Sequence, residues 1–287
     1  MQPCRSTPSL YPVNAITMKK LFSIVTAFVL IASASIAQTR ETRAVDTFTK
    51  ISFRTSGKVY VKIGSPQKVE IEGSKEALEK VKTTVDGGKL SIGPEGRWYD
   101  WSWGDDNKVI VNITVASIEA LSVSGSGSMV VQSKITSGTL DLNVSGSGSL
   151  EAEIDAADVD ADVSGSGDME LKGKCKSFSS DISGSGGVRL ALAIAGEAEF
   201  DLSGSGKVDA TGTAQTVKAG ITGSGKIYAS NLETDKCTVR ISGSGDVEIN
   251  VKTELDARIS GSGSVSYKGN PARVNADSSG SGKVRKM

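Results

Sequence analysis

The 287-residue sequence predicts an all-β fold, a parallel β-helix or β-solenoid with coils of about 19 residues. A Gly-Ser-Gly tripeptide recurs from Gly125 to Gly282 at steps of 18 to 21 residues. Apolar and polar residues alternate on both sides of each tripeptide, which is typical of β-strands. Such a constant period indicates units that pack only on their neighbours. The tripeptides begin at Gly125, Gly146, Gly165, Gly184, Gly204, Gly223, Gly243, Gly261 and Gly280, which we assign as the structural turns of the repeat.

Two apolar columns flank the motif and define the inside of each coil. The residue two positions before the motif is Val, Ile or Leu in every repeat but the last, where it is Ser278. The second residue after the motif is always apolar, from Met129 to Val284. If the alternation continues through the motif, its glycines face inward and its serines outward. The stacked serine hydroxyls are then expected to bond between coils.

The N-terminal region resembles a secretory leader. Lys19 and Lys20 follow Met18 and precede an apolar run from Leu21 to Ile31, which is too short to span a membrane. We predict a signal peptide over 18–37, an upstream extension over 1–17 from a misassigned start, and one elongated domain over 38–287. Residues 1–37 contain three of the 33 basic residues (Arg5, Lys19 and Lys20) and none of the 33 acidic ones, so the mature net charge is 30 − 33 = −3. This balance excludes a general attraction to nucleic acid.

Residues 44–115 are predicted as N-terminal coils with a capping region, and 116–287 as the repeats. Thr47 to Ile63 is interpreted as two paired strands around a turn at Ser56-Gly57, and Val69–Ile71 as another strand. Ser74 is a candidate N-cap for a short helix to about Lys82. Val85 to Ile92, with Gly87-Gly88 at its centre, predicts a hairpin or the next coil.

All three tryptophans lie in one polar segment that breaks the strand pattern. Flat aromatic side chains suit sugar rings or apolar partners, because they offer a large contact area at low entropic cost. We therefore assign this segment as the ligand-binding site; the alternative is a lid that packs on the end of the solenoid. The candidate residues are Trp98, Tyr99, Trp101 and Trp103.

The sequence offers little catalytic chemistry. It has no histidine, and the phosphate-loop-like Gly220 to Lys226 is followed by Ile227 where Ser or Thr should bind Mg²⁺. We therefore expect no nucleotide, cofactor or catalytic residue. Asp155, Asp158, Asp160 and Asp162 could gather a cation or form a carboxylate pair for glycan cleavage. The alternation of Asp158, Asp160 and Asp162 also fits a solvated polar stripe on one outward face. Cys175 and Cys237, about three coils apart, are expected to be buried free thiols.

Three features together resemble the putative auto-transporter adhesin family, also called the head GIN domain family, of exported Bacteroidetes-type proteins. They are Phe48-x-x-Ile51, the segment from Leu78 to Leu90-x-Ile92, and the repeated Val/Ile-Ser-Gly-Ser-Gly-x-Val/Ile motif. The resemblance covers roughly residues 45 to 285. It implies a β-helical fold and an adhesive role at the cell surface, and it brings no catalytic residues with it.

Leader, repeat and resemblance together predict an exported, non-catalytic β-solenoid that acts as an adhesin or as a glycan- or protein-binding module. The predicted partners are a surface glycan or protein, or a second copy, and the mature chain is not expected to span a membrane. The location is the periplasm, the outer cell surface or the medium. The alternatives are a polysaccharide lyase or hydrolase on a β-helix, and a periplasmic scaffold.

Overall fold

The computed structural model describes residues 39–94 and 108–287, and Thr39–Met287 forms one compact unit. Seven strands precede the repeats: β1 (Thr39–Arg43), β2 (Lys50–Phe53), β3 (Gly57–Ile63), β4 (Lys68–Gly73), β5 (Val81–Asp86), β6 (Lys89–Pro94) and β7 (Val109–Val115). The helix α2 (Lys75–Lys80) lies between β4 and β5. The strands of the repeats are β8 (Ala120–Gly125), β9 (Ser128–Val131), β10 (Ile135–Gly146), β11 (Ser149–Gly165), β12 (Asp168–Gly184), β13 (Gly187–Ile194), β14 (Glu197–Gly204), β15 (Lys207–Gly223), β16 (Lys226–Gly243), β17 (Asp246–Gly261), β18 (Ser264–Lys268), β19 (Arg273–Gly280) and β20 (Lys283–Lys286).

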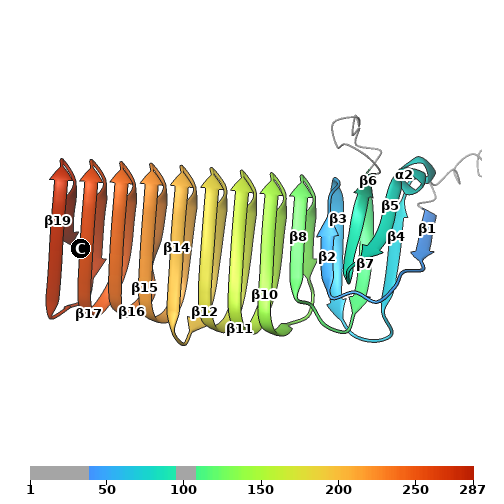
Figure 1. The fold of residues 1–287 in the computed structure, drawn as a ribbon, viewed down its shortest axis with the longest axis horizontal. Coiled ribbons are helices and arrows are strands. Elements are labelled where there is room, and N and C mark those ends of the chain that lie inside the picture. Colours follow the sequence, from blue (N-terminus) through green and yellow to red (C-terminus); the bar gives the residue numbers. More distant parts are fainter. Residues whose placement is uncertain (1–38, 95–107) are drawn as a thin grey trace, which may run out of the picture. The chain divides into compact units, whose positions relative to one another are not determined.

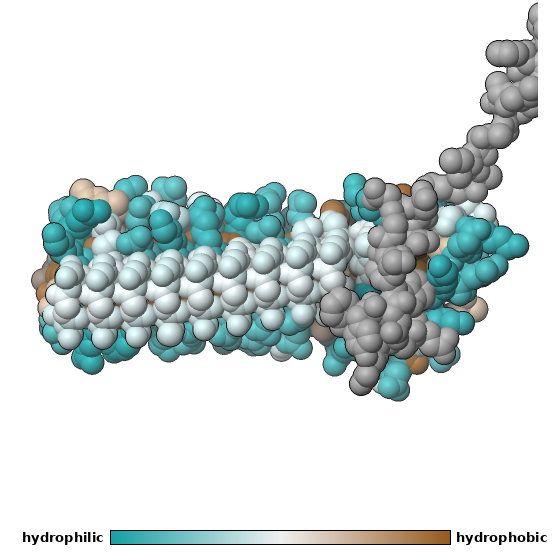
Figure 2. Space-filling view, turned by 90° about the horizontal axis from the view of Figure 1, so that it is seen from above, coloured by the Kyte–Doolittle hydropathy of each residue, from teal (hydrophilic) through white to brown (hydrophobic). Residues whose placement is uncertain are grey.

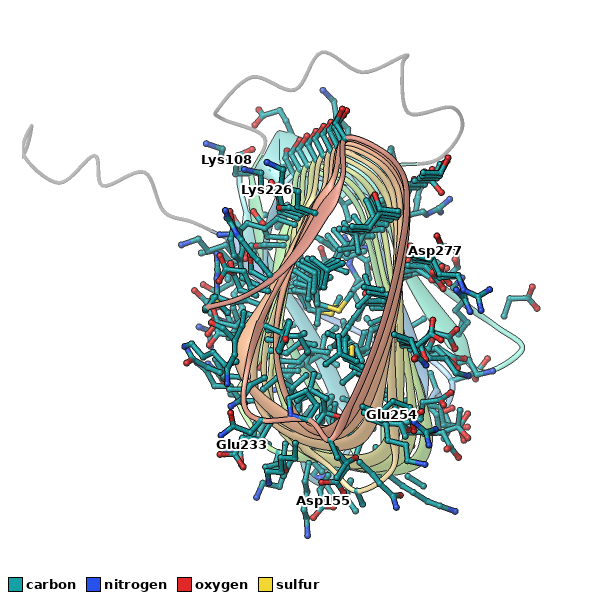
Figure 3. All side chains as sticks on the ribbon, turned by 90° about the vertical axis from the view of Figure 1, so that its left-hand side faces the viewer. Lys108, Asp155, Lys226, Glu233, Glu254 and Asp277 are labelled. Atoms are coloured by element: carbon teal, nitrogen blue, oxygen red, sulfur yellow. The ribbon has the colours of Figure 1, made fainter. Side chains whose placement is uncertain are left out.

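The repeats stack as parallel coils in register, which confirms the predicted β-solenoid (Figure 1). Each coil has two walls joined at the Gly-Ser-Gly corner: β14, for example, ends at Gly204, and β15 begins at Lys207 on the opposite wall. The first glycines pair directly from coil to coil, as Gly165 does with Gly184. Seen along the stack, the coils superimpose as a narrow oval with the corner at one end (Figure 3).

The core lies between the two walls and consists of the predicted apolar columns. Side chains at alternate positions of every coil are buried, from Val123 and Met129 in the first repeat to Ile259 and Val265 near the last. Because the side-chain period of a strand is two, this alternation buries one face of each wall and leaves the other in solvent. The stacking of like residues removes a continuous apolar surface from water, which is the main stabilising contribution to such a fold.

The two glycines of each motif have different roles, which corrects the expectation that both simply face inward. The second glycine is buried, and a Cβ on Gly206 would lie 2.6 Å from Cγ2 of Ile182 in the preceding coil. The first glycine turns the corner with a positive φ, which is +116° at Gly204. A Cβ there would point along the stack and approach the carbonyl oxygen of Gly184 to 2.6 Å. The first glycine therefore permits close stacking as well as the turn.

A different structure covers the N-terminal end of the stack. The helix α2 begins at the predicted cap, where Ser74 Oγ accepts a hydrogen bond from the Ala77 N–H at 3.2 Å, and it buries Ala77 and Leu78. It ends two residues earlier than predicted, because Val81 already belongs to β5. β5 and β6 form the expected antiparallel hairpin, and β4 pairs antiparallel with both β1 and β7.

The prediction that Thr47 to Ile63 forms a strand pair is wrong. β2 and β3 belong to opposite walls, and the residues between Phe53 and Gly57 form a corner like those of the repeats. β2 pairs with β6 and β8, whereas β3 pairs with β7 and β9. Strand propensity identified both strands, but their partners lie in neighbouring coils.

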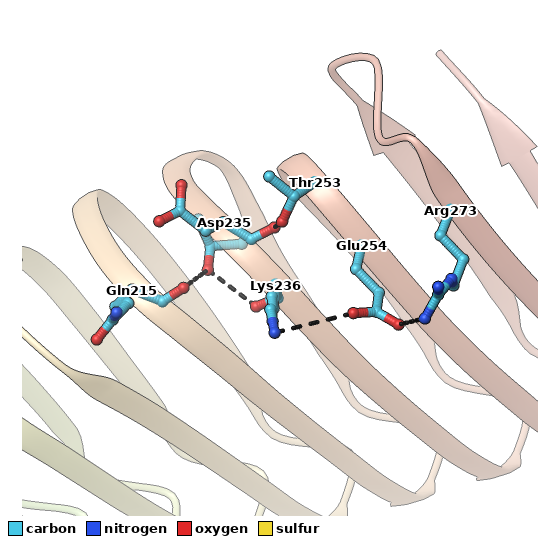
Figure 4. Close-up of polar contacts among 7 residues, drawn as sticks. Gln215, Asp235, Lys236, Thr253, Glu254 and Arg273 are labelled. Carbon is cyan, nitrogen blue, oxygen red and sulfur yellow. Dashed lines mark hydrogen bonds and ion pairs between the residues drawn. The ribbon is translucent and has the colours of Figure 1, made fainter.

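The turns at the far end of the oval are held by side chains that bond to backbone carbonyls. Thr234 Oγ1 shares its proton between the carbonyls of Gln215 (3.2 Å) and Lys236 (3.0 Å), so one hydroxyl links two coils. Figure 4 labels Gln215 and Lys236 at this turn. The two thiols in the described part, Cys175 and Cys237, are free and buried as predicted. Burial raises the pKa of Cys175 to about 11 and that of Cys237 to about 12. No helix in the described residues is long and apolar enough to cross a membrane.

The corner geometry predicts opposite outcomes for two adjacent substitutions. Gly204→Val should lower the free energy of unfolding by about 2–4 kcal/mol, because the side chain meets the Gly184 carbonyl and the positive φ is unfavourable for valine. Ser205→Ala, at an exposed position, should change it by no more than about 0.5 kcal/mol. Thermal denaturation followed by circular dichroism measures both variants. Equal melting temperatures would contradict this account of the corner.

Candidate functional site: the serine ridge and the charged wall

The Gly-Ser-Gly corners together form a continuous uncharged strip along the stack, which we call the serine ridge (Figure 2). Its outermost side chains are the middle serines of the nine motifs, all of which are exposed. These serines are Ser126, Ser147, Ser166, Ser185, Ser205, Ser224, Ser244, Ser262 and Ser281. Their stacking at one end of the oval is visible along the axis (Figure 3).

Hydrogen bonds between neighbouring corners satisfy much of the ridge backbone. The Ser205 N–H donates to the Gly184 carbonyl at 2.8 Å, and the Lys207 N–H donates to the Gly186 carbonyl at 3.0 Å. The same two bonds recur in other coils, for example from Ser147 to Gly125 at 2.9 Å. The backbone bonds therefore run along the stack, and the side-chain hydroxyls are the main polar groups that the ridge presents outward.

These ridge hydroxyls do not bond to one another, contrary to the sequence-based expectation. Beside the ridge, Ser149 Oγ donates to Ser128 Oγ at 2.9 Å. On the ridge itself, within residues 39–94 and 108–287, no such bond occurs. Parallel strands lie about 4.8 Å apart and a hydroxyl bond needs about 2.8 Å, so two stacked serines bond only where their side chains lean toward one another, as Ser149 and Ser128 do. Each hydroxyl is consequently available as a donor and an acceptor for another molecule.

One wall next to the ridge, which we call the charged wall, carries a charged residue three positions before six of the nine motifs. In three consecutive coils this position is Asp162, Asp181 and Asp201. Burial, followed by the charges of Asp181, Asp160 and Asp141, raises the pKa of Asp162. Burial and the charge of Asp181 also raise the pKa of Asp201, which Lys218 partly offsets. The carboxylates in this half of the wall repel one another.

The sign of the column reverses at a glycine. After Asp201 the column continues with Gly220, Arg240, Arg258 and Asp277. Asp201 leans over the empty position, since a Cβ on Gly220 would lie 2.1 Å from its Oδ1. An open hollow of about 640 Å³ beside the ridge is lined by these residues: Asp201, Gly220, Arg240, Arg258 and Asp277. Sequence inspection overlooked Arg240 and Arg258, although aligning the repeats three residues before the motif would have placed them in one column.

The four aspartates considered as a cation or cleavage site do not form one cluster. Asp155 lies at the far turn, where it pairs with Lys174 at 3.2 Å (Figure 3). Asp158 accepts a hydrogen bond from Ser177 at 2.5 Å, and Asp160 and Asp162 lie on the charged wall next to Asp141 and Asp181. In the part of the chain that the structure describes, no group of three or more Asp, Glu or Cys is arranged to hold a metal ion.

The predicted ligand-binding residues Trp98, Tyr99, Trp101 and Trp103 lie outside the described residues, but the positions that flank them are defined. The corner from Arg54 to Gly57 lies directly below the first Gly-Ser-Gly corner, because Phe53 pairs with Val123 and Lys58 with Ser128. One layer further, a Cβ on Gly93 would lie 3.0 Å from Arg54, and Val109 pairs with Gly57. Gly93 and Val109 therefore occupy the corner position of the layer next to the corner from Arg54 to Gly57, in line with the serine ridge.

A stack of parallel β-coils with a uniform corner defines the chain as a β-solenoid. The family model described as "Putative auto-transporter adhesin, head GIN domain" matches residues 47–211 and 181–271, so the chain belongs to that family. Among curated proteins, no sequence matches this chain.

Crystal structures of three bacterial proteins share the fold. A putative adhesin from Parabacteroides distasonis superimposes with a TM-score of 0.66 at 22% identity, over 88% of this chain and 98% of that one. A putative adhesin from Parabacteroides merdae gives 0.65 at 21% identity, over 87% and 95% of the two chains. A putative lipid binding protein from Parabacteroides distasonis gives 0.66 at 22% identity, over 87% and 96%. The names of these neighbours concern adhesion or lipid binding, not catalysis.

The repulsion among the carboxylates of the charged wall predicts that Asp162→Asn raises the free energy of unfolding in a pH-dependent way. The folded chain raises the pKa of Asp162, so the folded state prefers the protonated carboxyl and loses stability as the pH rises through that pKa. The substitution should raise the unfolding free energy at pH 7 by about 0.5 kcal/mol, a value limited by solvent screening. The gain should disappear below about pH 3, where the carboxyl is protonated in both states.

Thermal denaturation of both proteins at pH 7 and pH 3 measures the difference. Asp235→Asn is the matched control, because Asp235 is an exposed carboxylate on the far turn beside Lys252 and should show no such gain. A lower stability of Asp162→Asn at pH 7 would show that this carboxylate forms favourable contacts instead.

Proposed function

We propose that the chain is an exported, non-catalytic adhesin module that binds a surface glycan or protein through the serine ridge and the aromatic residues Trp98, Tyr99, Trp101 and Trp103. The observation that best supports this is the ridge itself, an uncharged row of exposed hydroxyls from Ser126 to Ser281. Gly93 and Val109, the described residues that precede and follow the aromatic segment in the sequence, stack on the corner from Arg54 to Gly57 in line with this ridge.

The chemistry of the two parts favours a glycan. The ridge offers a row of exposed hydroxyls that have no partner of their own within the described residues. Such hydroxyls can exchange hydrogen bonds with sugar hydroxyls in either direction. Trp98, Trp101 and Trp103 supply flat apolar faces for sugar rings. A neutral polar row beside aromatic faces is less suited to a charged ligand.

Export and the absence of catalysis are parts of the same proposal. The basic and apolar segment over 18–37 supports export, as does membership of a family described as adhesins. The lack of histidine and the dispersal of Asp155, Asp158, Asp160 and Asp162 support a binding role over glycan cleavage. Family and neighbours provide the adhesive role in general terms, and the ligand is left to experiment.

Replacing Trp98, Trp101 and Trp103 together by alanine should abolish binding to bacterial or host surface glycans on an array. The coils should stay folded, because each repeat supplies its own apolar core and packs only on its neighbours. The melting temperature should therefore stay within about 2 °C of the wild-type value. The control is replacement of Tyr60 and Tyr228 on the described walls by alanine, which should leave glycan binding unchanged.

A second variant tests the ridge independently. Ser205→Glu with Ser224→Glu places two charges on adjacent ridge corners without filling the core, and it should weaken binding at least about tenfold. If the wild-type protein binds surface proteins but no glycan, the ligand is a protein rather than a glycan. Release of reducing ends from a bound glycan would show an enzyme, and a large fall in melting temperature for the tryptophan variant would show a structural lid. Either of the last two results would overturn the proposal.

A further inference from the structure

The last described coil leaves one edge of each wall open. β19 pairs with β17 on one side, and within residues 39–94 and 108–287 it pairs with no strand on the other. All eight of its residues are exposed, whereas the strands of the inner coils bury every second residue. The opposite end of the stack, by contrast, is covered by antiparallel strands and by α2.

The open edge exposes groups that the rest of the fold keeps from water. Val274 lies over the buried Leu255 of the preceding coil, yet it is 39% exposed. The outward-facing N–H and C=O groups of β19 also form an unpaired edge, which is a template for another strand. Figure 3 shows this end of the stack directly, with the apolar side chains between the two walls. An added strand would pair this edge and cover the apolar residues.

We propose that this edge binds a second copy of the chain, through antiparallel pairing of β19 with itself about a two-fold axis at Asn275. In this register Arg273 of each copy lies opposite Asp277 of the other, and Val274 lies opposite Ala276. The apolar pair faces inward, since Val274 and Ala276 stack on the buried Leu255 and Ala257. The charged pair faces outward on both sides of the axis.

Neighbouring registers lack this complementarity. An axis one residue earlier places Arg273 opposite Asn275, and an axis one residue later places Asp277 opposite Asn275. An axis at Asp277 itself would bring two carboxylates together. In an antiparallel pair of strands, the two-fold axis can pass through a hydrogen-bonded or a non-hydrogen-bonded pair of residues. The backbone therefore permits an axis between the two Asn275 residues.

The charges of β19 suit this pairing. Arg273 donates to Glu254 of the preceding coil at 3.0 Å, which holds its guanidinium on the outer face of the wall (Figure 4). Asp277 has no ion pair within the described residues and is exposed on the same wall (Figure 3). Opposite charges directly across an antiparallel pair are stabilising, and the two-fold axis makes two such pairs.

The same axis keeps the basic strand β20 away from its own copy. Lys283, Arg285 and Lys286 would repel one another if two β20 strands faced each other. Asn275 lies 280 − 275 = 5 residues below the corner glycine Gly280, whereas Lys286 lies only 286 − 282 = 4 residues below Gly282 on the other wall. Measured from the Gly-Ser-Gly corner, an axis at Asn275 therefore lies further away than the last residue of β20, Lys286. The β20 strands of the two copies then lie on opposite sides of the axis.

Charge exchange tests the register. The full chain is expressed and the resulting protein is purified. Its molar mass from sedimentation equilibrium should be twice that of the monomer. Asp277→Arg and Arg273→Asp should each give a monomer, and the double exchange Arg273→Asp with Asp277→Arg should restore the dimer. Asp181→Arg is the matched control, because Asp181 occupies the same column of the charged wall in an inner coil, and it should leave the dimer intact.

A disulfide tests the axis. Two Asn275 residues facing one another would have Cα atoms about 4.5–5.5 Å apart, within the range that a disulfide spans. Asn275→Cys should therefore give a covalent dimer on mild oxidation, whereas the wild type and Asn270→Cys, which lies off the axis, should not. A wild-type monomer at all concentrations, as expected if the edge takes a strand of another protein, would overturn the proposal. So would a dimer that resists both charge reversals and does not cross-link.

Discussion

The close approach of one corner to the next is the constraint on which the whole stack depends. The two walls can pair in register only if the backbone at the corner keeps the same spacing as the strands, and a side chain would prevent this. At Gly204 the position of a Cβ lies 2.6 Å from the carbonyl of Gly184, where that carbonyl accepts a hydrogen bond from Ser205 at 2.8 Å. Glycine allows the bond and the turn together, and the aligned apolar columns follow from the shared register.

This constraint also determines which surfaces are available for function. Because the two glycines of each corner carry no side chain, the middle serines are the motif's outermost side chains and make this edge a neutral strip of hydroxyls, whereas charged residues lie on the walls and at the far turn. On the charged wall the coils differ from one another: Asp162, Asp181 and Asp201 give way to Arg240 and Arg258 after Gly220. The repeat therefore conserves geometry at the ridge while permitting a varied pattern beside it.

The sequence predicted the solenoid and its inward columns because the same local motif, with nearly the same apolar alternation around it, occurs in all nine repeats. It predicted α2 from Ser74 and its cap for the same local reason. It failed where the partner of a residue is remote in sequence, as in the pairing of β2 and β3, and where direction matters, as at the first glycine of each corner. Stacked charges such as Arg240 and Arg258 are about one coil apart, so patterns within a single coil do not reveal them.

The identical corners also affect how the gene can evolve. At the corners, every internal coil presents the same glycine register to the coil before it and the coil after it, so duplication of one unit of about 19 residues creates no new kind of corner. Unequal recombination within the repeats would lengthen or shorten the stack by about 4.8 Å for each coil. The length of the stack could thus be adjusted by copy number alone, while the cover formed by α2 and the antiparallel strands at one end and the open edge of β19 at the other stay unchanged.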